Sequence, residues 1–375
     1  MYKIFTVVGT RPEIIKLSRL INIFDKNFNH QLVNTGQNFN YELNEIFFKD
    51  LKIKKPDYFL NSAKNTPSET IGKIIEKSDK ILSIEKPDAI LVLGDTNSCL
   101  SVISAKKRKI PIFHIEAGNR CFDQRVPEEV NRKIVDHISD MNLTYSNIAR
   151  ENLLRENIPA DQVIKIGSPM YEVLEYNKKR IKSSQIIKKL KLLQKKYYLV
   201  SIHREENIEA SSNVNKIQNI LNTLAKNYKL PVIVSTHPRT RKMIEKKKIK
   251  FNPLVKTFKP FGFFDYINLQ LEAKAVLSDS GSITEESSIL NFPALNLRET
   301  HERFEGMEEA SVMMVGLEIK NIINGLAVLE NQSRGKKRDL EIVEEYNVKN
   351  TSKKVLRIIL SYVDYIKRNI WKKFS

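Results

Sequence analysis

The sequence has few cysteines and no long apolar run. Its only cysteines are Cys99 and Cys121, which argues against a disulfide framework and a cysteine-based zinc cluster, and favours a reducing compartment. No apolar segment reaches the roughly 18 residues that a membrane-spanning helix needs. The start of the chain, Met1–Gly9, resembles a first strand and not a cleavable signal. We therefore expect a cytoplasmic protein without membrane insertion.

Two common nucleotide-binding signatures are also missing. No two glycines are spaced Gly-X-Gly, as the dinucleotide fingerprint requires, and the chain has no Gly-x-x-x-x-Gly-Lys-Ser/Thr segment. These absences argue against a nicotinamide-binding domain and against a P-loop. No group of carboxylates calls for magnesium, so we expect neither a cofactor nor a metal.

The charge of the chain is strongly positive, at +19 over 375 residues. Binding to nucleic acid or to an anionic membrane is one explanation of such an excess. However, the lysines are scattered, and their densest runs lack the interleaved aromatic residues of a single-strand platform. We interpret the excess as solvated lysine faces with a modest contribution from a phosphorylated substrate, and we expect no nucleic-acid partner.

Apolar, strand-like segments alternate with helical segments along the whole chain. This alternation predicts βαβ units and parallel sheets, and the chain length favours two domains. We place an N-terminal domain at residues 1–177, joined by a C-terminal helix at 352–375, and a second domain at 178–351. The expected strands are Ile4–Val8, Gln31–Val33, Ala89–Gly94, Ile110–Phe113, Leu143–Tyr145, Tyr198–Ile202, Pro231–Ser235, Ala275–Asp279 and Pro293–Leu297.

Polar residues follow these strands in both halves of the chain. The strand ending at Phe113 leads into His114 and Glu116, and Pro127 and Glu128 look like the first turn of the next helix. In open α/β sheets ligands bind at the carboxyl ends of strands, so two facing sheets would collect such residues in one cleft. For this loop alone, the alternative is a surface loop whose acids pair with its arginines. The residues that follow other strands in the same way are Arg11, Asp95, His203, Ser280 and Arg303.

The segment Asp279–Ser282 has the features of a phosphate-binding site. Ser280 can cap the following helix, Gly281 permits close backbone approach, and the free N–H groups carry partial positive charge. Glu286, further into the helix, could reach sugar hydroxyls such as those of a ribose. Arginines, here Arg11 and Arg303, can clamp phosphate oxygens bidentately. A plain helix cap at Ser280 and Gly281 is the alternative.

The acid and base candidates are three carboxylates, Asp95, Glu116 and Glu128, together with His203. Carboxylates crowded in a water-poor site shift each other's pKa values and can exchange protons near neutral pH. His203 could pair with a diphosphate or assist a leaving group, although a satisfied histidine at a strand end is the alternative. His114 fits a structural role better.

Six motifs in order resemble the non-hydrolysing UDP-N-acetylglucosamine 2-epimerases, over about residues 9 to 316. The motifs are Gly9–Lys16, Leu93–Asn97, His114–Gly118, Pro127–Arg132, Asp279–Gly281 with Glu285 and Glu286, and Glu302–Arg303. The resemblance implies an α/β fold with two Rossmann-like doubly wound parallel-sheet domains in a GT-B arrangement, an active site in the interdomain cleft, and a homodimer. It also implies inversion at C2 of a UDP-2-acetamido sugar, without NAD, for surface polysaccharide precursors.

The resemblance assigns roles to particular residues. It draws the groups that move protons on two faces of C2 from Asp95, Glu116 and Glu128, with His203 near the diphosphate, and it does not say which acid serves which face. The positions that it implies for substrate binding are Arg11, Lys16, Arg132, Ser280, Gly281, Ser282, Glu286 and Arg303.

Some positions depart from the family pattern. Glu205 replaces the second arginine of a usual His-Arg-Arg-Glu segment, Phe304 replaces a usual proline, and Gln37–Tyr41 lacks the Gln-His pair of the allosteric UDP-sugar site of bacterial members. Other segments, such as Asn119–Arg125, resemble a subgroup that converts UDP-2-acetamido-2,6-dideoxy-L-talose to UDP-N-acetyl-L-fucosamine. The sequence also leaves open a GT-B glycosyltransferase that uses a UDP-sugar donor.

Overall fold

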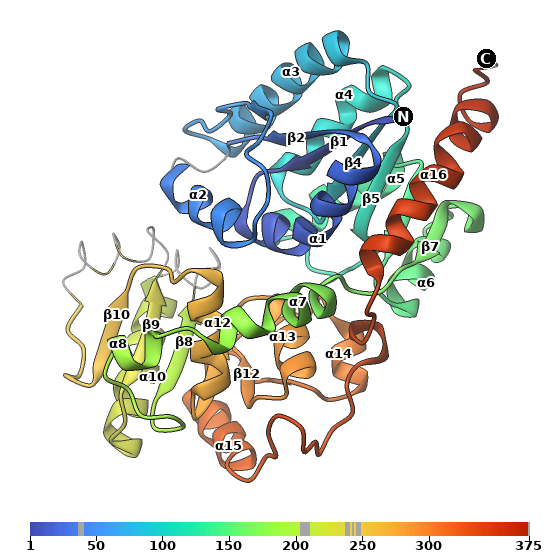
Figure 1. Cartoon of the computed structure of the whole chain (residues 1–375). Coiled ribbons are helices and arrows are strands. Elements are labelled where there is room, and N and C mark those ends of the chain that lie inside the picture. Colours follow the sequence, from blue (N-terminus) through green and yellow to red (C-terminus); the bar gives the residue numbers. More distant parts are fainter. Residues whose placement is uncertain (37–40, 203–210, 237–240, 242–243, 245–248, 374–375) are drawn as a thin grey trace. The chain divides into compact units, whose positions relative to one another are not determined.

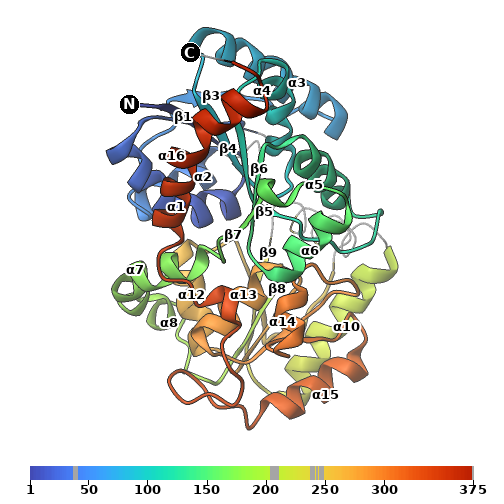
Figure 2. The ribbon, with the colours of Figure 1, turned by 90° about the vertical axis from the view of Figure 1, so that its right-hand side faces the viewer.

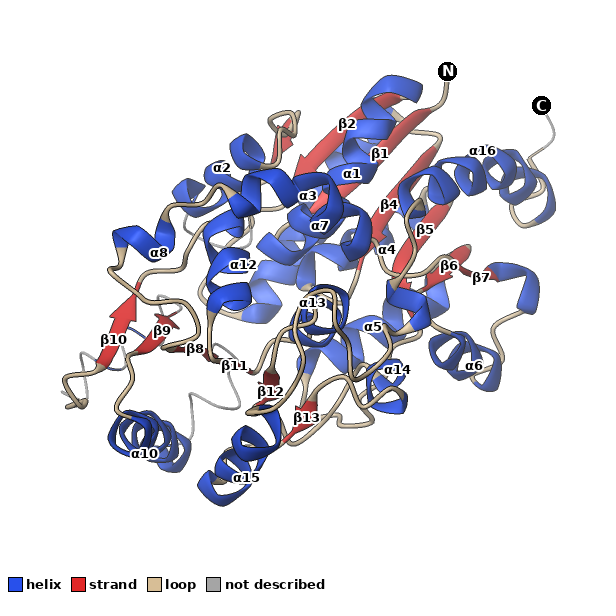
Figure 3. Ribbon diagram, turned by 60° about the horizontal axis from the view of Figure 1, so that its bottom comes forward, coloured by secondary structure: helices blue, strands red, loops and turns tan. Residues whose placement is uncertain are grey.

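The computed structural model describes residues 1–36, 41–202, 211–236, 241, 244 and 249–373 (Figure 1). The chain divides into two compact units. Unit 1 comprises Met1–Glu175 and Glu344–Ser375, and unit 2 comprises Tyr176–Val343. Each unit is built on a parallel sheet with helices around it (Figure 3), which confirms the prediction of two parallel-sheet α/β domains.

Unit 1 contains a seven-stranded sheet in the order β3-β2-β1-β4-β5-β6-β7, and all its neighbouring strands pair in parallel. The inner strands are almost continuously apolar because helices cover both faces of the sheet, and all five residues of β4 are buried. The strands are β1 (Lys3–Val8), β2 (Asn29–Asn34), β3 (Tyr58–Phe59), β4 (Ala89–Leu93), β5 (Ile112–Ala117), β6 (Met141–Thr144) and β7 (Val163–Lys165).

Unit 2 contains a six-stranded sheet in the order β10-β9-β8-β11-β12-β13, again with parallel pairing throughout. Its core packs Val200, Leu277 and Leu295 of three neighbouring strands against residues such as Leu224 and Ile322 from the covering helices. The strands are β8 (Tyr198–Ile202), β9 (Val232–Thr236), β10 (Val255–Phe258), β11 (Ala275–Ser278), β12 (Ala294–Asn296) and β13 (Met313–Met314).

The described helices alternate with these strands, and α7 carries the boundary between the two units. In unit 1 they are α1 (Arg11–Asn27), α2 (Tyr41–Asp50), α3 (Pro67–Glu85), α4 (Val102–Lys107), α5 (Pro127–Ile138), α6 (Asn147–Arg155) and α16 (Thr351–Asn369), with the short 3-10 helices η1 (Asn97–Ser101), η2 (Ala160–Gln162) and η3 (Glu344–Tyr346). The others are α7 (Met170–Lys182), α8 (Ile186–Lys189), α10 (Ser211–Tyr228), α12 (Phe263–Glu272), α13 (Ser282–Leu290), α14 (Phe304–Glu308) and α15 (Ile319–Leu329).

The strand order reverses direction once in each sheet. In unit 1 the chain runs outward from β1 to β3 and then returns to the other side of β1 with β4, so the switch lies between β1 and β4. In unit 2 it lies between β8 and β11. The loops leaving the strands on either side of a switch separate, and ligands bind in the crevice at this point of an open α/β sheet. The two switch points therefore position any site in either unit.

The last helix, α16, packs against α1, the first helix of unit 1 (Figures 1 and 2). Its apolar residues recur at helical spacing, and Val355, Ile359, Val363 and Ile366 are fully buried. The end of the chain thus completes the helical layer over the sheet that its beginning forms.

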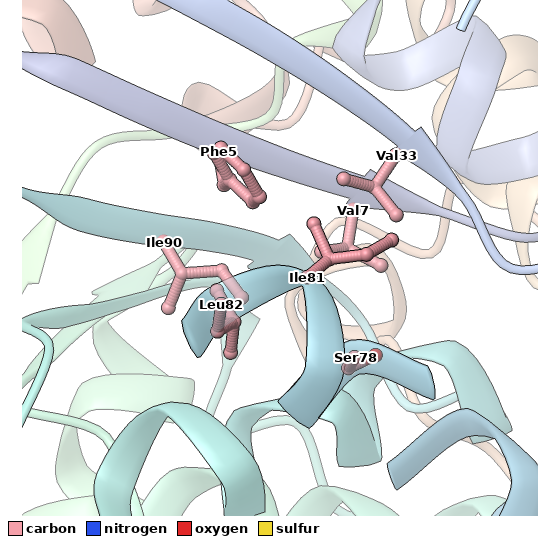
Figure 4. Close-up of a pocket in the computed structure, with 7 residues that line it drawn as sticks. All are labelled: Phe5, Val7, Val33, Ser78, Ile81, Leu82 and Ile90. Carbon is pink, nitrogen blue, oxygen red and sulfur yellow. The ribbon is translucent and has the colours of Figure 1, made fainter. Parts of the chain in front are cut away.

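A small cavity of about 10 Å³ remains in the core of unit 1 between α3 and the sheet (Figure 4). Its walls are almost entirely apolar, and its volume is at the lower limit for one water molecule, so it is no ligand site. The lining residues are Phe5, Val7, Val33, Ser78, Ile81, Leu82 and Ile90.

The strand expected at Ile110–Phe113 is displaced in the structure, where β5 runs from Ile112 to Ala117. His114 and Glu116 therefore lie within the strand and do not follow it. None of the helices in the described part of the chain has both the length and the apolar character to cross a bilayer.

Candidate functional site

The carboxyl ends of β4 and β5 in unit 1 hold two of the predicted acids. Asp95 lies two residues after β4, at the switch point of the sheet. Glu116 lies in a β-bulge, where the register between β5 and β6 shifts between Ile115 and Ala117. Its backbone is left-handed, with φ of 66°, a conformation that costs a non-glycine residue about 1–3 kcal/mol and that concentrates at functional sites. The bulge re-aims the Glu116 side chain out of the regular alternation of the strand.

Two cations connect these acids in a buried cluster. The ammonium Nζ of Lys16 lies 2.7 Å from Oε2 of Glu116. The guanidinium of Arg132 contacts the carboxylate of Asp95 and also lies 3.5 Å from Oε1 of Glu116. All four side chains are at most 15% exposed, so the charges act on one another with little screening by solvent. The structure thus brings together Asp95, Glu116, Lys16 and Arg132, all predicted from the sequence.

Glu128 occupies the first turn of α5, as predicted, and Pro127 is the first residue of that helix. It lies one turn before Arg132, and residues four apart share one face of a helix. Glu128 is partly exposed and is therefore not a member of the buried cluster. It lies on the face of α5 that also carries Arg132. Arg11 is also partly exposed, with its guanidinium carbon 5.8 Å from the ring centre of Phe47.

A second set of buried polar residues, His114 and Asp136, contacts the backbone next to this cluster. Nε2 of His114 donates to the carbonyl of Gly94, at 2.7 Å, and Nδ1 lies 2.8 Å from Asp136. Burial alone would raise the pKa of Asp136, but its hydrogen bond to His114 and the positive charge of Arg120 outweigh burial and lower it. His114 is therefore structural, as expected. Asp136 was not predicted from the sequence, because its partners are up to 22 residues away along the chain.

Glu13 is another buried acid that sequence reasoning did not single out. Its side chain accepts hydrogen bonds from the backbone of Gly9 and Thr10 and from the hydroxyls of Thr96 and Ser98. Burial raises its pKa, although all four hydrogen bonds act in the opposite direction. The spacing Thr10-x-x-Glu13 is a capping-box signal that would have placed this acid at the helix start.

In unit 2 the predicted phosphate-binding segment, Asp279–Ser282, follows β11. We call this segment, together with the start of α13, the phosphate seat. The N-cap of α13 is Gly281 and not Ser280 as expected. The Ser280 hydroxyl oxygen still accepts from the backbone N–H of Ser282, the first residue of the helix, at 3.4 Å, and contacts Ser282 Oγ at 3.0 Å. Gly281 has φ of −62°, and a methyl group there would meet nothing within 4 Å. Neither the backbone nor the packing of the chain therefore requires glycine at this position. The space beside it is open, and open space next to a helix N-terminus suits an anionic ligand.

Arg303 reaches the same helix from the loop after β12. Its Nη2 lies 3.3 Å from Glu285, in the first turn of α13, and its backbone N–H donates to Nδ1 of His301. Burial and the charge of Arg298 lower the pKa of His301 to about 4, so this ring is neutral near pH 7. Glu286 is buried as well and accepts a 2.6 Å hydrogen bond from Gln270. The structure thus places Ser280, Gly281, Ser282, Glu286 and Arg303 in or beside one helix start.

Some predicted features fall outside the described residues. His203, with the segment to Asn207, is one, and Gln37–Asn40 is another. Among the described residues, no group of three or more histidines, cysteines, aspartates and glutamates could hold a metal ion.

A second cavity, of about 500 Å³, lies at the opposite edge of the unit 2 sheet, where β8 and β11 begin. It is therefore separate from the seat at α13. Its lining residues are Lys195, Lys196, Leu230, Lys274, Glu330, Gln332, Ser333, Arg334 and Lys337.

Comparison with known proteins identifies close relatives. A family model described as UDP-N-acetylglucosamine 2-epimerase matches residues 23–360. A UDP-N-acetylglucosamine 2-epimerase of Methanococcus maripaludis is 36% identical over 333 residues, which cover 86% of this chain and 90% of that protein.

Solved structures agree with this result over the whole chain. The structure of UDP-N-acetylglucosamine 2-epimerase from Rickettsia bellii is 49% identical, covers 100% of both chains and has a TM-score of 0.92. The UDP-GlcNAc 2-epimerase of Methanocaldococcus jannaschii, in complex with UDP-GlcNAc and UDP, is 32% identical with a TM-score of 0.88 and covers 96% of this chain and 99% of that chain.

Proposed function

The chain belongs to the UDP-N-acetylglucosamine 2-epimerase family, and from this premise we propose that it inverts C2 of a UDP-linked 2-acetamido sugar by eliminating and re-adding UDP. It is an isomerase that acts on a UDP-sugar. The observation that carries the C2 chemistry is the β-bulge at Glu116. Because of the bulge, the Glu116 side chain pairs with Lys16 and approaches Arg132, which also contacts Asp95.

The reaction needs proton transfer on both faces of C2. One carboxylate removes the C2 proton while the C1–O bond to UDP breaks, which gives a 2-acetamidoglucal and UDP. A second carboxyl group then returns a proton to the opposite face of C2, and a UDP oxygen re-forms the bond to C1. Asp95, Glu116 and Glu128 are the groups that we propose for these transfers. Lys16 and Arg132 keep Glu116 and Asp95 in place.

The diphosphate is the leaving group and needs positive charge around it. We assign it to the start of α13, where Ser280, Gly281 and Ser282 offer backbone and hydroxyl donors. Arg303 can supply charge-assisted hydrogen bonds to phosphate oxygens, and Glu286 is suited to accept from sugar hydroxyls. Arg11, the first residue of α1, is a further cation that the resemblance implies for substrate binding.

Two substrate pairs fit this chemistry. The names of the relatives favour UDP-N-acetylglucosamine and UDP-N-acetylmannosamine. The segment Asn119–Arg125, which resembles the fucosamine-forming subgroup, favours UDP-2-acetamido-2,6-dideoxy-L-talose and UDP-N-acetyl-L-fucosamine. Either product would serve as a precursor of surface polysaccharide.

The decisive experiment is incubation with each of these UDP-sugars in D₂O, without nicotinamide or metal. We expect deuterium at C2 and a product epimeric at C2, both read by proton NMR. Sugar that stays unlabelled with every candidate would overturn the proposal. Transfer of the sugar to an added acceptor would instead indicate a glycosyltransferase.

The variant Glu116→Gln tests the assignment of the proton-transfer groups. It keeps the size of the side chain and removes its basicity, so C2 exchange should be lost while calorimetry still detects UDP binding. Full-rate exchange at saturating substrate together with lost UDP binding would place Glu116 in nucleotide recognition instead.

A further inference from the structure

Glu13 lies in the first turn of α1, three residues after the N-cap Thr10, and its side chain is buried. One carboxylate oxygen, Oε2, accepts from the backbone N–H groups of Gly9 and Thr10, the latter at 2.9 Å. These bonds close a capping box on its own helix. A cap of this kind stabilises a helix start and needs only this one oxygen.

The other oxygen, Oε1, has a different task. It accepts from the hydroxyls of Thr96 and Ser98, the second at 2.8 Å. Both residues follow Asp95 after β4, Ser98 in the short helix η1, whereas Glu13 lies in α1 after β1, and these two strands flank the switch point of the sheet. One buried carboxylate therefore connects the two chain segments that diverge at that point.

Side chains from α1, β5 and α5 form hydrogen bonds to the turn Gly94–Thr96, which contains Asp95. Glu13 fixes it through Thr96, and three side chains from β5 and α5 fix its other polar groups. These are His114 on the Gly94 carbonyl at 2.7 Å, Asn131 on the Asp95 carbonyl at 3.0 Å, and Arg132 on the Asp95 carboxylate. A proton-transfer group has to be held within a fraction of an ångström of its productive position, and this arrangement provides such support.

We propose that Glu13 is a positioning residue for Asp95, and that its carboxylate sets the geometry of the proton-transfer site without touching the substrate. This inference rests on the function proposed above. Four donors converge on the carboxylate, and a methionine of similar length has no oxygen to accept from any of them. The loop after β4 would then lose its anchor, because these buried donors are left unsatisfied.

The chain contains a matched control for the capping role alone. Glu69 occupies the same position in α3, three residues after the N-cap Thr66, and the two residues exchange the same reciprocal capping bonds at 3.2 Å each. This capping box is exposed, and neither of its two bonds involves the loop after β4. A purely capping role for Glu13 would make Glu13→Met and Glu69→Met equivalent in turnover.

The experiment compares wild type, Glu13→Met and Glu69→Met for kcat of the C2 exchange and for UDP affinity. Glu13→Met should lower kcat by about 10- to 100-fold, as loss of a supporting partner of a reactive group does, while the Kd for UDP changes less than about twofold. Glu69→Met should keep wild-type kcat. If Glu13→Met turns over as fast as Glu69→Met, the positioning role is wrong. An inactive wild type would count against the proposed function and not against this role.

A second variant addresses the case in which Glu13→Met does not fold. The double substitution Thr96→Val and Ser98→Ala removes the hydroxyl donors and leaves the capping bonds of Glu13 to Gly9 and Thr10 intact. We expect a similar loss of kcat with UDP affinity retained. Combining it with Glu13→Met, where that variant folds, should add little to the loss of kcat, because both changes break the same connection. Wild-type kcat in the double variant, or fully multiplicative losses in the combination, would overturn the inference.

Discussion

The ammonium of Lys16 lies 2.7 Å from the carboxylate of Glu116, and neither side chain is more than 8% exposed. The two residues are 100 positions apart, on the first turns of α1 and the last residues of β5. Burying opposite charges is unfavourable unless they pair closely. The pair therefore links the stability of unit 1 to the position of the acid that we assign to C2 chemistry.

The first prediction concerns Lys16→Met, which preserves the length of the side chain and removes its charge. Glu116 would then lose its nearest cation and keep Arg132, at 3.5 Å. Breaking a buried pair on one side costs about 3–5 kcal/mol, and the remaining arginine should reduce this to about 2–3 kcal/mol. Urea denaturation measures the change in the free energy of unfolding, and C2 exchange should slow in the same variant.

Lys3→Met is the matched control for that measurement. Lys3 pairs with Glu85 at 3.0 Å, but both side chains are more than 20% exposed. Pairs at the surface contribute about 0–1 kcal/mol, so this variant should lose little stability. Equal losses in the two variants would mean that burial does not strengthen the pair at Glu116.

Several elements follow directly from local sequence patterns. The strand at Tyr198–Ile202 has the predicted bounds, and α5 begins at Pro127 as predicted. Apolar runs bounded by turn residues and a proline at a helix start are local signals, and the local chain determines both. The acids at Asp95 and Glu116 could be predicted for the same reason, because each lies at or just beyond the carboxyl end of an apolar strand.

Other features depend on contacts that the local pattern does not contain. The bulge at Glu116 arises from the register between β5 and β6, so the sequence placed this acid after the strand and not within it. The N-cap of α13 is Gly281 because of the backbone geometry. The sequence favoured Ser280 instead, because serine is preferred over glycine at N-cap positions. Glu13 and Asp136 are held by residues on other elements, and spacing along the chain does not show such partners.

The second prediction concerns the effect of pH on stability through His301. Its folded pKa of about 4 lies below its ordinary value of 6.5, so between these values the unfolded chain binds a proton that the folded chain does not. Stability therefore falls as the pH decreases from about 6.5 to about 4, by up to about 3 kcal/mol for this shift. Urea denaturation at pH 7 and pH 5 should show part of this loss in the wild type.

His301→Asn isolates that contribution, since an amide oxygen can still accept from the N–H of Arg303. The loss between pH 7 and pH 5 should be smaller in this variant than in the wild type. An unchanged pH dependence in His301→Asn would show that other groups determine it.

The last prediction tests the phosphate seat with Gly281→Ala. The backbone at Gly281 is right-handed helical, and the added methyl group would meet nothing within 4 Å, so the free energy of unfolding should change by less than about 1 kcal/mol. A phosphate seated on the start of α13 would meet that methyl group, and UDP should bind at least about tenfold more weakly by calorimetry, which corresponds to about 1.4 kcal/mol.

The matched change Gly306→Ala separates this effect from simple crowding. Its methyl group would lie 2.1 Å from Cγ2 of Thr284 in α13, so the chain itself has to shift, and overpacking of this kind destabilises by about 1–3 kcal/mol. Gly306→Ala should therefore lower the urea midpoint, whereas Gly281→Ala should lower UDP affinity at an unchanged midpoint. Wild-type UDP affinity in Gly281→Ala would exclude the start of α13 as the diphosphate site. A phosphate bound to the backbone at Gly281 would have to occupy the space that the added methyl group fills.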